Sequence, residues 1–314
     1  MKKTILLTLC LTVLGIVGVN AQAGIGTIAL HHEGKVTIYR GSISQEAMDA
    51  SVKGDTLYFS EGTFSGFNVT HGIVIIGAGE DTKVTSDITI TGNKENKDLG
   101  DYVFKGLNLA TDFVVNDSVK GLSMIQCQMR DLDFARYGER IFIDDAKVNM
   151  SYVRGSLKLS SSVYGLTAAH SKIKQVYENA NFPGAVSFYH CNVGSGAFIR
   201  MANTFINSIV QRMDNGVFVN CLCTRTYSAF YDSYIDDNFS FNDTMDCSYS
   251  DEELKSKGYF GNDSTVVGIT GGDSPYTLEL FTPHIIEHKL DMDKVNKTLK
   301  VTLKMSSEAP KNDD

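Results

Sequence analysis

A short pattern of apolar and polar positions recurs through the middle of the chain. It runs apolar, variable, turn-forming, small or apolar, variable, apolar, and its copies read FKGLNL, MIQCQM, IDDAKV, AAHSKI, FYHCNV, FINSIV and FYDSYI. Side chains alternate between the two faces of a strand, so the first and fourth positions point the same way only if the chain bends between them. The pattern therefore predicts two short strands joined by a bend at the third position.

The residue types at the bend support this prediction. The third positions hold Gly106, Gln126, Asp145, His170, His190, Asn207 and Asp232. Gly accepts a left-handed backbone freely, and Asn, Asp and His tolerate it better than most residues, so only the glutamine is an exception. The fourth positions are mostly small, as expected for side chains stacked in a narrow interior: Leu107, Cys127, Ala146, Ser171, Cys191, Ser208 and Ser233.

The spacing of the bends indicates a solenoid. Successive third positions lie 17 to 25 residues apart, which suits one coil of a repeat protein. An antiparallel sandwich is the competing fold, but its turn signals come every ~8–12 residues. We therefore predict an all-β fold, a single right-handed parallel β-helix over residues 24–280. A near-copy, FVNCLC, begins only 13 residues after its predecessor and is predicted to occupy another face of the same coil.

A solenoid must be capped at both ends, and the chain offers a candidate at each. Residues 42–45 have the spacing of a capping box, and Ile43, Ala47, Met48 and Val52 form an apolar stripe, which predicts a short helix through about Val52. Residues 281–305 contain two alternating segments, 285–290 and 298–303, predicted to be a strand pair that caps or docks on the last coils. The polar tail, 306–314, is predicted to be mobile.

The N-terminus predicts export. Two lysines precede an apolar run that ends at Val19, and small residues follow, so residues 1–21 are predicted to be a signal peptide cleaved after Ala21 or Ala23. This run is too short to span a membrane comfortably, and no later segment is long and apolar enough. We expect a monomer in the periplasm, at the cell surface or outside the cell.

Charge and cysteine content narrow the function further. The chain has 29 basic and 37 acidic residues and no basic run, which makes nucleic acid a poor partner. Five of the six cysteines lie beyond the predicted signal peptide, and only Cys221 and Cys223 are close in sequence. Their positions in the repeat predict small core residues, while a disulfide between neighbouring coils stays open.

Two segments carry a resemblance to a known family. After the predicted helix, GDTLYFSEGTF and IVIIGAGEDT resemble the opening of pectin-lyase-like β-helix proteins, and VGITGGDSPYT, from Val267, resembles the closing segment of secreted Bacteroides-type β-helix proteins. The resemblance covers about residues 43–280. It implies the fold but no activity, because this superfamily contains lyases, hydrolases and proteins without an assigned reaction.

The chemistry of that superfamily does not transfer directly. Its pectate lyases hold calcium with carboxylates, and its polygalacturonases use paired aspartates with a Gly-His-Gly segment. This chain has no Gly-His-Gly, Arg-Ile-Lys or Asn-Thr-Asp segment. Its own acidic candidates are the pair Asp144 and Asp145, and a cluster that suits calcium or a solvated turn: Asp236, Asp237, Asp243 and Asp246. Calcium is the only cofactor these residues suggest.

Two histidines and a set of polar residues complete the candidates. His170 and His190 suit a base or a metal pair, but as bend residues they are expected mainly to shape the backbone and to lie close together. Polar and aromatic residues at comparable distances after the bends are predicted to line one outer face: Asp133, Arg136, Tyr152, Arg154, Tyr177 and Arg200. Tyrosines suit stacking on sugars, and arginines suit binding carboxylates.

These observations lead to three hypotheses. The first is an exported β-helix protein that binds an extended polysaccharide, with no catalysis implied. The second is a calcium-dependent lyase or a hydrolase that acts on acidic glycans. The third is a structural or adhesive surface protein.

Overall fold

The computed structural model describes residues 26–91, 101–134, 143–160, 163, 165–179, 185–197, 202–213, 216–225, 229–277, 284–293 and 298–306. The chain divides into two compact units, residues 1–278 and 279–314. The predicted signal peptide and the tail beyond residue 306 lie outside the described residues. Among those described, no helix is long and apolar enough to span a membrane.

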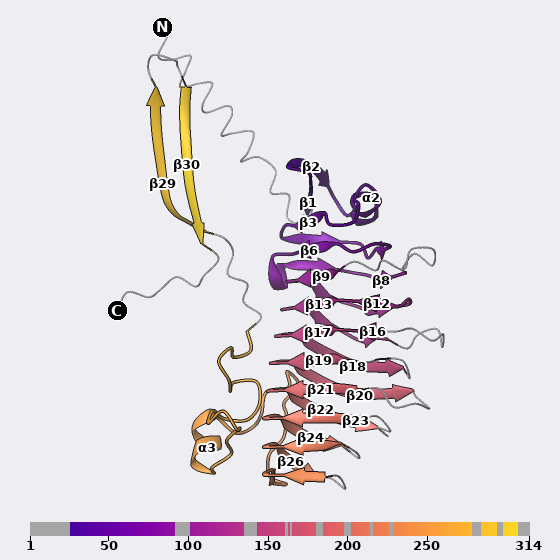
Figure 1. Ribbon diagram of the computed structural model, residues 1–314, viewed down its shortest axis with the longest axis vertical. Coiled ribbons are helices and arrows are strands. Elements are labelled where there is room, and N and C mark those ends of the chain that lie inside the picture. Colours follow the sequence, from indigo (N-terminus) through magenta and orange to yellow (C-terminus); the bar gives the residue numbers. More distant parts are fainter. Residues whose placement is uncertain are drawn as a thin grey trace. The chain divides into compact units, whose positions relative to one another are not determined.

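The first unit is a parallel β-helix, which confirms the predicted fold (Figure 1). One wall, sheet 1, contains in spatial order β2 (Lys35–Arg40), β1 (Thr27–His32), β3 (Thr56–Phe59), β6 (Val74–Ile76), β9 (Tyr102–Lys105), β13 (Leu122–Ile125), β17 (Ala146–Asn149), β19 (Leu166–Ala169), β21 (Ala185–Tyr189), β23 (Ala202–Ile206), β25 (Val217–Val219) and β27 (Ala229–Tyr231). From β3 onward all neighbours are parallel, whereas β1 pairs antiparallel with both β2 and β3.

A second wall, sheet 2, lies beyond the bends. Its main path is β28 (Tyr234–Ile235), β26 (Leu222–Arg225), β24 (Ile209–Met213), β22 (Asn192–Ala197), β20 (Lys172–Asn179), β18 (Tyr152–Ser160), β14 (Gln128–Met129), β10 (Asn108–Leu109), β7 (Thr82–Val84) and β4 (Gly62–Phe64). Its continuation contains β15 (Leu132–Asp133), β11 (Phe113–Val115), β8 (Ile88–Ile90) and β5 (Asn68–Val69), and a separate pair is formed by β12 (Val119–Lys120) and β16 (Ile143–Asp144).

A column of left-handed residues joins the two main sheets. It contains Gly106, Gln126, Met150, His170, His190, Asn207, Asn220 and Asp232, whose φ angles lie between 44° and 63°. From the first of these to the seventh, each backbone N–H donates to a carbonyl of the next rung at 3.0 to 3.1 Å. The bends therefore stack in register, as the repeat predicted.

Two details of that repeat are corrected. Asp145 is left-handed but precedes β17, in line with Gly121 and Gly165 at the other end of the sheet 1 strands, so the bend of its coil is Met150. The near-copy FVNCLC does not occupy another face, because β25 pairs with β23 and β27 and Asn220 stands in the main column. The coil shortens from 24 residues after Gln126 to 12 before Asp232, and this shortening disguised the rung.

A ladder of buried serines and cysteines follows the bends. Its members are Cys127, Ser151, Ser171, Cys191, Ser208, Cys221 and Ser233, and each donates to the carbonyl two residues before it at 2.7 to 3.4 Å. Four serine hydroxyls also accept the N–H of the ladder residue one rung earlier, at 3.0 to 3.2 Å. The ladder thus satisfies polar backbone groups that the bend removes from both sheets.

The cysteines of this ladder are structural. No disulfide joins the cysteines that the structure describes. Burial raises the pKa of the Cys127 thiol to about 11 and those of Cys191 and Cys221 to about 12, against weak opposition from backbone hydrogen bonds. These thiols therefore stay protonated and behave as small core residues.

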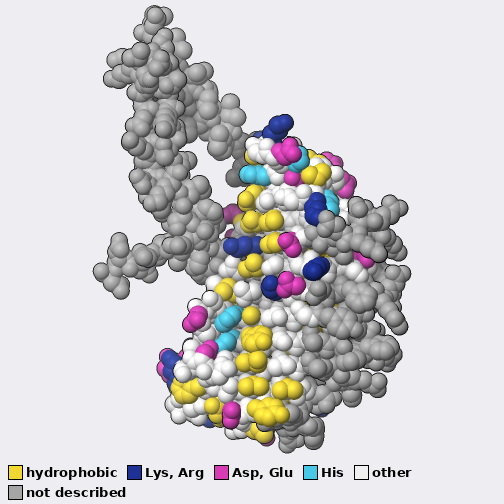
Figure 2. Space-filling model, viewed as in Figure 1, with side chains coloured by type: hydrophobic (Ala, Val, Ile, Leu, Met, Phe, Trp, Pro, Cys, Tyr) yellow, Lys and Arg dark blue, Asp and Glu magenta, His cyan; other side chains and the backbone are white. Residues whose placement is uncertain are grey.

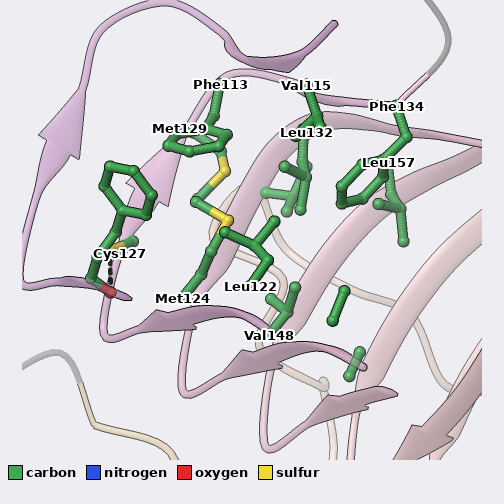
Figure 3. Packing of buried hydrophobic residues seen from close by; sticks show 14 of the residues in the cluster. Phe113, Val115, Leu122, Met124, Cys127, Met129, Leu132, Phe134, Val148 and Leu157 are labelled. Carbon is green, nitrogen blue, oxygen red and sulfur yellow. Dashed lines mark hydrogen bonds between the residues drawn. The ribbon is translucent and has the colours of Figure 1, made fainter. Parts of the chain in front are cut away.

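Apolar side chains from successive rungs fill the interior (Figure 3). The rings of Phe188, Phe205 and Phe218 stack in neighbouring rungs, with centroids 4.6 and 4.9 Å apart and planes 6° and 8° from parallel. This spacing equals the distance between paired strands, so the strand register itself sets the stack.

The N-terminal end is capped by α2 (Ser44–Asp49), which buries Ala47 and Met48. The predicted capping box is wrong, because the helix begins after Ile43 and has no side-chain cap. The predicted stripe also ends early, since Val52 is half exposed. After β6, the short 3-10 helix η1 (Gly79–Asp81) forms the glycine turn.

Residues 236–277, the return segment, leave the last rung and run back over the outer side of the bends. They contain α3 (Asp251–Ser256), which has a complete capping box between Ser250 and Glu253. Leu254 and other apolar residues of the segment pack on Ile209 and Leu222, which face outward from sheet 2.

The second unit contains β29 (His284–Asp293) paired antiparallel with β30 (Thr298–Ser306). These strands match the predicted pair and extend past its limits. Their docking on the last coils stays a prediction.

Candidate ligand-binding strip on sheet 2

The outer face of sheet 2 carries charged and aromatic side chains that the return segment leaves open. We call this set the sheet 2 strip: Arg130, Arg154, Lys158, Lys174, Tyr177 and Arg212. Lys158 on β18 pairs in register with Tyr177 on β20, and the chain runs on through β22 to Arg212 on β24. The strip therefore follows the solenoid axis across several rungs.

Buried aspartates hold the cations of the strip from behind. Arg130 forms a two-pronged pair with Asp112, at 2.8 and 2.9 Å, and Lys158 binds Asp131 at 2.7 Å and Asp133 at 3.5 Å. The carboxylate side chains are at most 15% exposed, whereas those of Arg130 and Lys158 are 58% and 31% exposed. Water therefore meets mainly the positive partners of these pairs.

The same aspartates also organise the backbone. A carboxylate oxygen of Asp87 accepts the N–H of Asp112 at 3.2 Å, and one of Asp131 accepts the N–H of Ser156 at 2.7 Å. Opposite Asp131, β18 contains a bulge at Gly155, where an added Cβ would lie 2.3 Å from the carboxylate. Glycine at the bulge lets the backbone approach the carboxylate.

Electrostatics keep both cations charged. Partial burial lowers the pKa of Lys158, but the hydrogen bond to Asp131 and the charges of Asp131 and Asp133 outweigh it, so the pKa lies above its ordinary value. The hydrogen bond to Asp112, followed by its charge, raises the pKa of Arg130. Both side chains are donors to an anion at any physiological pH.

The predicted outer face divides into two regions. Asp133, Arg154 and Tyr177 lie in or beside the sheet 2 strip, with Tyr177 45% exposed and the Arg154 guanidinium donating to the Leu109 carbonyl. Tyr152 is buried, and its hydroxyl donates to the Asp243 carbonyl of the return segment at 2.8 Å. Two further predicted members, Arg136 and Arg200, lie outside the described residues.

The misplacement of Tyr152 has a simple origin. It lies seven residues after Asp145, like Asp133 and Tyr177 after their bends, but the true bend is Met150, only two residues earlier. Lys158 was missed for a related reason, because the bulge in β18 shifts it one position from the Tyr177 spacing. Counting the extra residue of the bulge would have found it.

The acidic candidates for calcium are dispersed. Asp236 is buried and accepts from the hydroxyls of Tyr249 and Tyr259, both at 2.9 Å, and backbone donation from Asn238 is the main reason its pKa is lowered. Asp246 forms an ion pair with Lys172. Asp237 is exposed, and Asp145 pairs with Lys147 at 3.0 Å. Across the described ranges, no three His, Cys, Asp or Glu side chains are grouped as metal ligands.

The histidines lie side by side, with parallel rings whose centroids are 5.2 Å apart. His190 contacts Asp263 at 2.7 Å and the Gly268 carbonyl at 3.2 Å, so this bend residue also anchors the return segment. Asn207 donates to Asn262 at 2.9 Å and accepts its backbone N–H at 3.1 Å. The bend column is therefore a docking surface as well as a turn.

Comparison with known proteins gave no match to a family model, a curated protein or a solved structure. The pectin-lyase-like and Bacteroides-type resemblances stay predictions. What the structure establishes is a parallel β-helix whose sheet 2 presents one covered and one open outer region.

Proposed function

We propose that this protein is exported and binds an extended acidic polysaccharide along the sheet 2 strip. The observation that carries the proposal is the placement of Lys158: two aspartates fix it from behind, and Tyr177 lies beside it in the next rung. A fixed cation next to an exposed aromatic ring suits a sugar that bears a carboxylate or sulfate group.

The rigidity of the strip supports binding. Lys158 and Tyr177 project from paired strands, and Arg130 is held by two hydrogen bonds to one carboxylate. Side chains that are already ordered lose less conformational entropy when a ligand binds. The ligand therefore meets a preformed row of donors.

The length of the strip favours a polymer. Neighbouring rungs are ~4.8 Å apart, so the four steps from the β15 rung to Arg212 on β24 span ~19 Å. A single sugar covers only part of such a row. A regularly charged chain can place successive acidic groups along it.

Protonation favours binding over proton abstraction. The raised pKa of Lys158 keeps this residue in its cationic form, which suits it to hold an anion and makes it a poor base at neutral pH. This argument supports the binding hypothesis over a lyase that uses Lys158 as its base.

Affinity electrophoresis in polygalacturonate and in a neutral glucan tests the proposal. We expect retardation by the acidic polymer that weakens with salt, at least about tenfold weaker binding for Tyr177→Ala, and no change for Lys147→Ala. Tyr177→Ala removes only an exposed ring and leaves both aspartate–lysine pairs intact, so folding is preserved. Equal retardation of wild type and Tyr177→Ala would reject the strip as the binding site.

A parallel assay separates binding from catalysis. Incubation with the same polymer, followed by measurement of unsaturated products and new reducing ends, should give no signal above a heat-treated control. Product that disappears in Lys158→Ala would replace the binding proposal with the lyase hypothesis.

A further inference from the structure

The C-terminal end of the solenoid is open. Ile235 stands in the column of sheet 2 that points inward, where its counterparts Val193, Val210 and Cys223 are at most 1% exposed. Ile235 itself is 63% exposed. Its rung is the last in the order of described strands, with β27 and β28 at the ends of sheets 1 and 2. A core position therefore faces outward at this end.

The N-terminal end presents an edge of complementary character. Strand β2 is the other terminal strand of sheet 1, and among the described strands only β1 pairs with it. Val36 and Ile38 point outward from it and are 53% and 52% exposed. A terminal strand with exposed apolar residues is a template for pairing with another chain.

The two edges match in direction and register. Because β1 is antiparallel to both β2 and β3, β2 runs in the same direction as the solenoid strands. Ile38 is aligned through Ala29 with Tyr58, and the same outward column leads through Tyr189 to Tyr231, which is 57% exposed. Figure 2 shows hydrophobic side chains gathered in a column along one face of the molecule.

The charges at the two edges are opposite. Lys35 and Arg40 bound β2 and are exposed, while the exposed Asp232 and Asp237 flank β28 at the other end. Opposite charges at the rims of two apolar edges favour contact between unlike ends and disfavour contact between like ends.

We propose that copies of this chain associate head to tail, with β2 of one copy adding as a parallel strand to β27 of the next. In this register Ile38 faces Tyr231 across the interface, and Val36 is aligned with position 229. A head-to-tail contact uses two different surfaces, so each copy keeps one free end and the assembly grows as a filament. This departs from the monomer that the sequence led us to expect, and it does not depend on polysaccharide binding.

Disulfide trapping tests the geometry directly. Full-length Ile38→Cys and Tyr231→Cys variants are prepared separately and then mixed under mild oxidation. Paired strands place facing Cβ atoms ~4.5–5.5 Å apart, within disulfide range, so the mixture should form a covalent dimer that neither variant forms alone. Replacing Ile38→Cys by Tyr58→Cys, which lies two strands further in, should abolish the dimer.

Sedimentation velocity over a range of concentrations gives the second readout. Wild type should form species larger than a monomer, and Tyr231→Lys or Ile38→Lys should weaken association at least about tenfold. Tyr189→Lys changes the same outward column in an interior rung and should leave association unchanged. A wild-type monomer at every concentration, or a cross-link that forms equally in Ile38→Cys alone, would overturn the proposal.

Discussion

The outer face of sheet 2 contains two regions built from the same strands but with different surroundings. Near the bends, Tyr152, Lys172 and Asn192 point outward and are met by the return segment, which supplies Asp246 to the lysine and the Met245 carbonyl to the asparagine. Further along the same strands, Lys158 and Tyr177 point outward with no such cover. A polar outward residue of a β-helix is therefore structural or available depending on a segment far away in sequence.

The largest expected effect comes from the core beneath both regions. Phe205→Ala removes the middle ring of a buried stack of three and should lower the free energy of unfolding by about 3–5 kcal/mol. Urea denaturation followed by circular dichroism measures this. If the loss were under about 1 kcal/mol, the stack would not support the two regions as described.

A smaller effect is expected in the covered region. Asp246→Asn removes the charge that pairs with the nearly buried Lys172. Because Asp246 is 50% exposed, we expect a loss of about 1–2 kcal/mol, below the value for a fully buried pair. Amide hydrogen exchange should become faster in residues 236–277 and stay unchanged in β9 and β13. Unchanged exchange in the return segment would show that this pair does not anchor it.

Acid should weaken the covered region selectively. Burial, and then the neighbouring His190, lower the pKa of His170 below 6.5, with Asp263 opposing them. The folded state thus prefers neutral His170, so its contribution is complete above the unfolded pKa and declines as the pH falls through 6.5. The pKa values of Asp246 and Asp263 are also lowered, so their contributions are lost only below the ordinary carboxylate range.

Urea midpoints at pH 7.5 and pH 5.5 measure this difference. Wild type should lose more stability over this interval than His170→Asn, which keeps a residue suited to the left-handed bend but does not titrate. Equal losses in the two proteins would remove His170 as the source of the acid sensitivity.

The smallest effect on stability is expected in the open region. Tyr177 is exposed and belongs to no described ion pair, so Tyr177→Ala should change the unfolding free energy by less than about 0.5 kcal/mol. The same substitution is expected to weaken polysaccharide binding strongly. A large loss of stability would make Tyr177 a structural residue and remove the contrast between the two regions.

The sequence predicted the local geometry better than the long-range contacts. Six of the seven predicted bends stand in the main column because Gly, Asn, Asp and His report a left-handed backbone through their own chemistry. Met150 gave no such signal, and Asp145 misled because a second bend column also tolerates aspartate. Register within a coil was therefore correct wherever the bend residue was typical.

The candidate site was only partly predictable. Asp133 and Tyr177 follow from repeat spacing, whereas Lys158 is displaced by a bulge that the sequence marks only with Gly155. The contact between His190 and Asp263 joins residues 73 positions apart, so no periodicity could reveal that the return segment covers half of the face. Long-range cover decides which polar residues remain open, and it requires the three-dimensional structure.

Hydrogen exchange with and without polygalacturonate tests the central claim most directly. If the open region binds the polymer, protection should increase in β18 and β20 around Lys158 and Tyr177, and the return segment should exchange as before. Protection confined to residues 236–277, or no change anywhere at saturating polymer, would contradict the assignment of the sheet 2 strip as the binding surface.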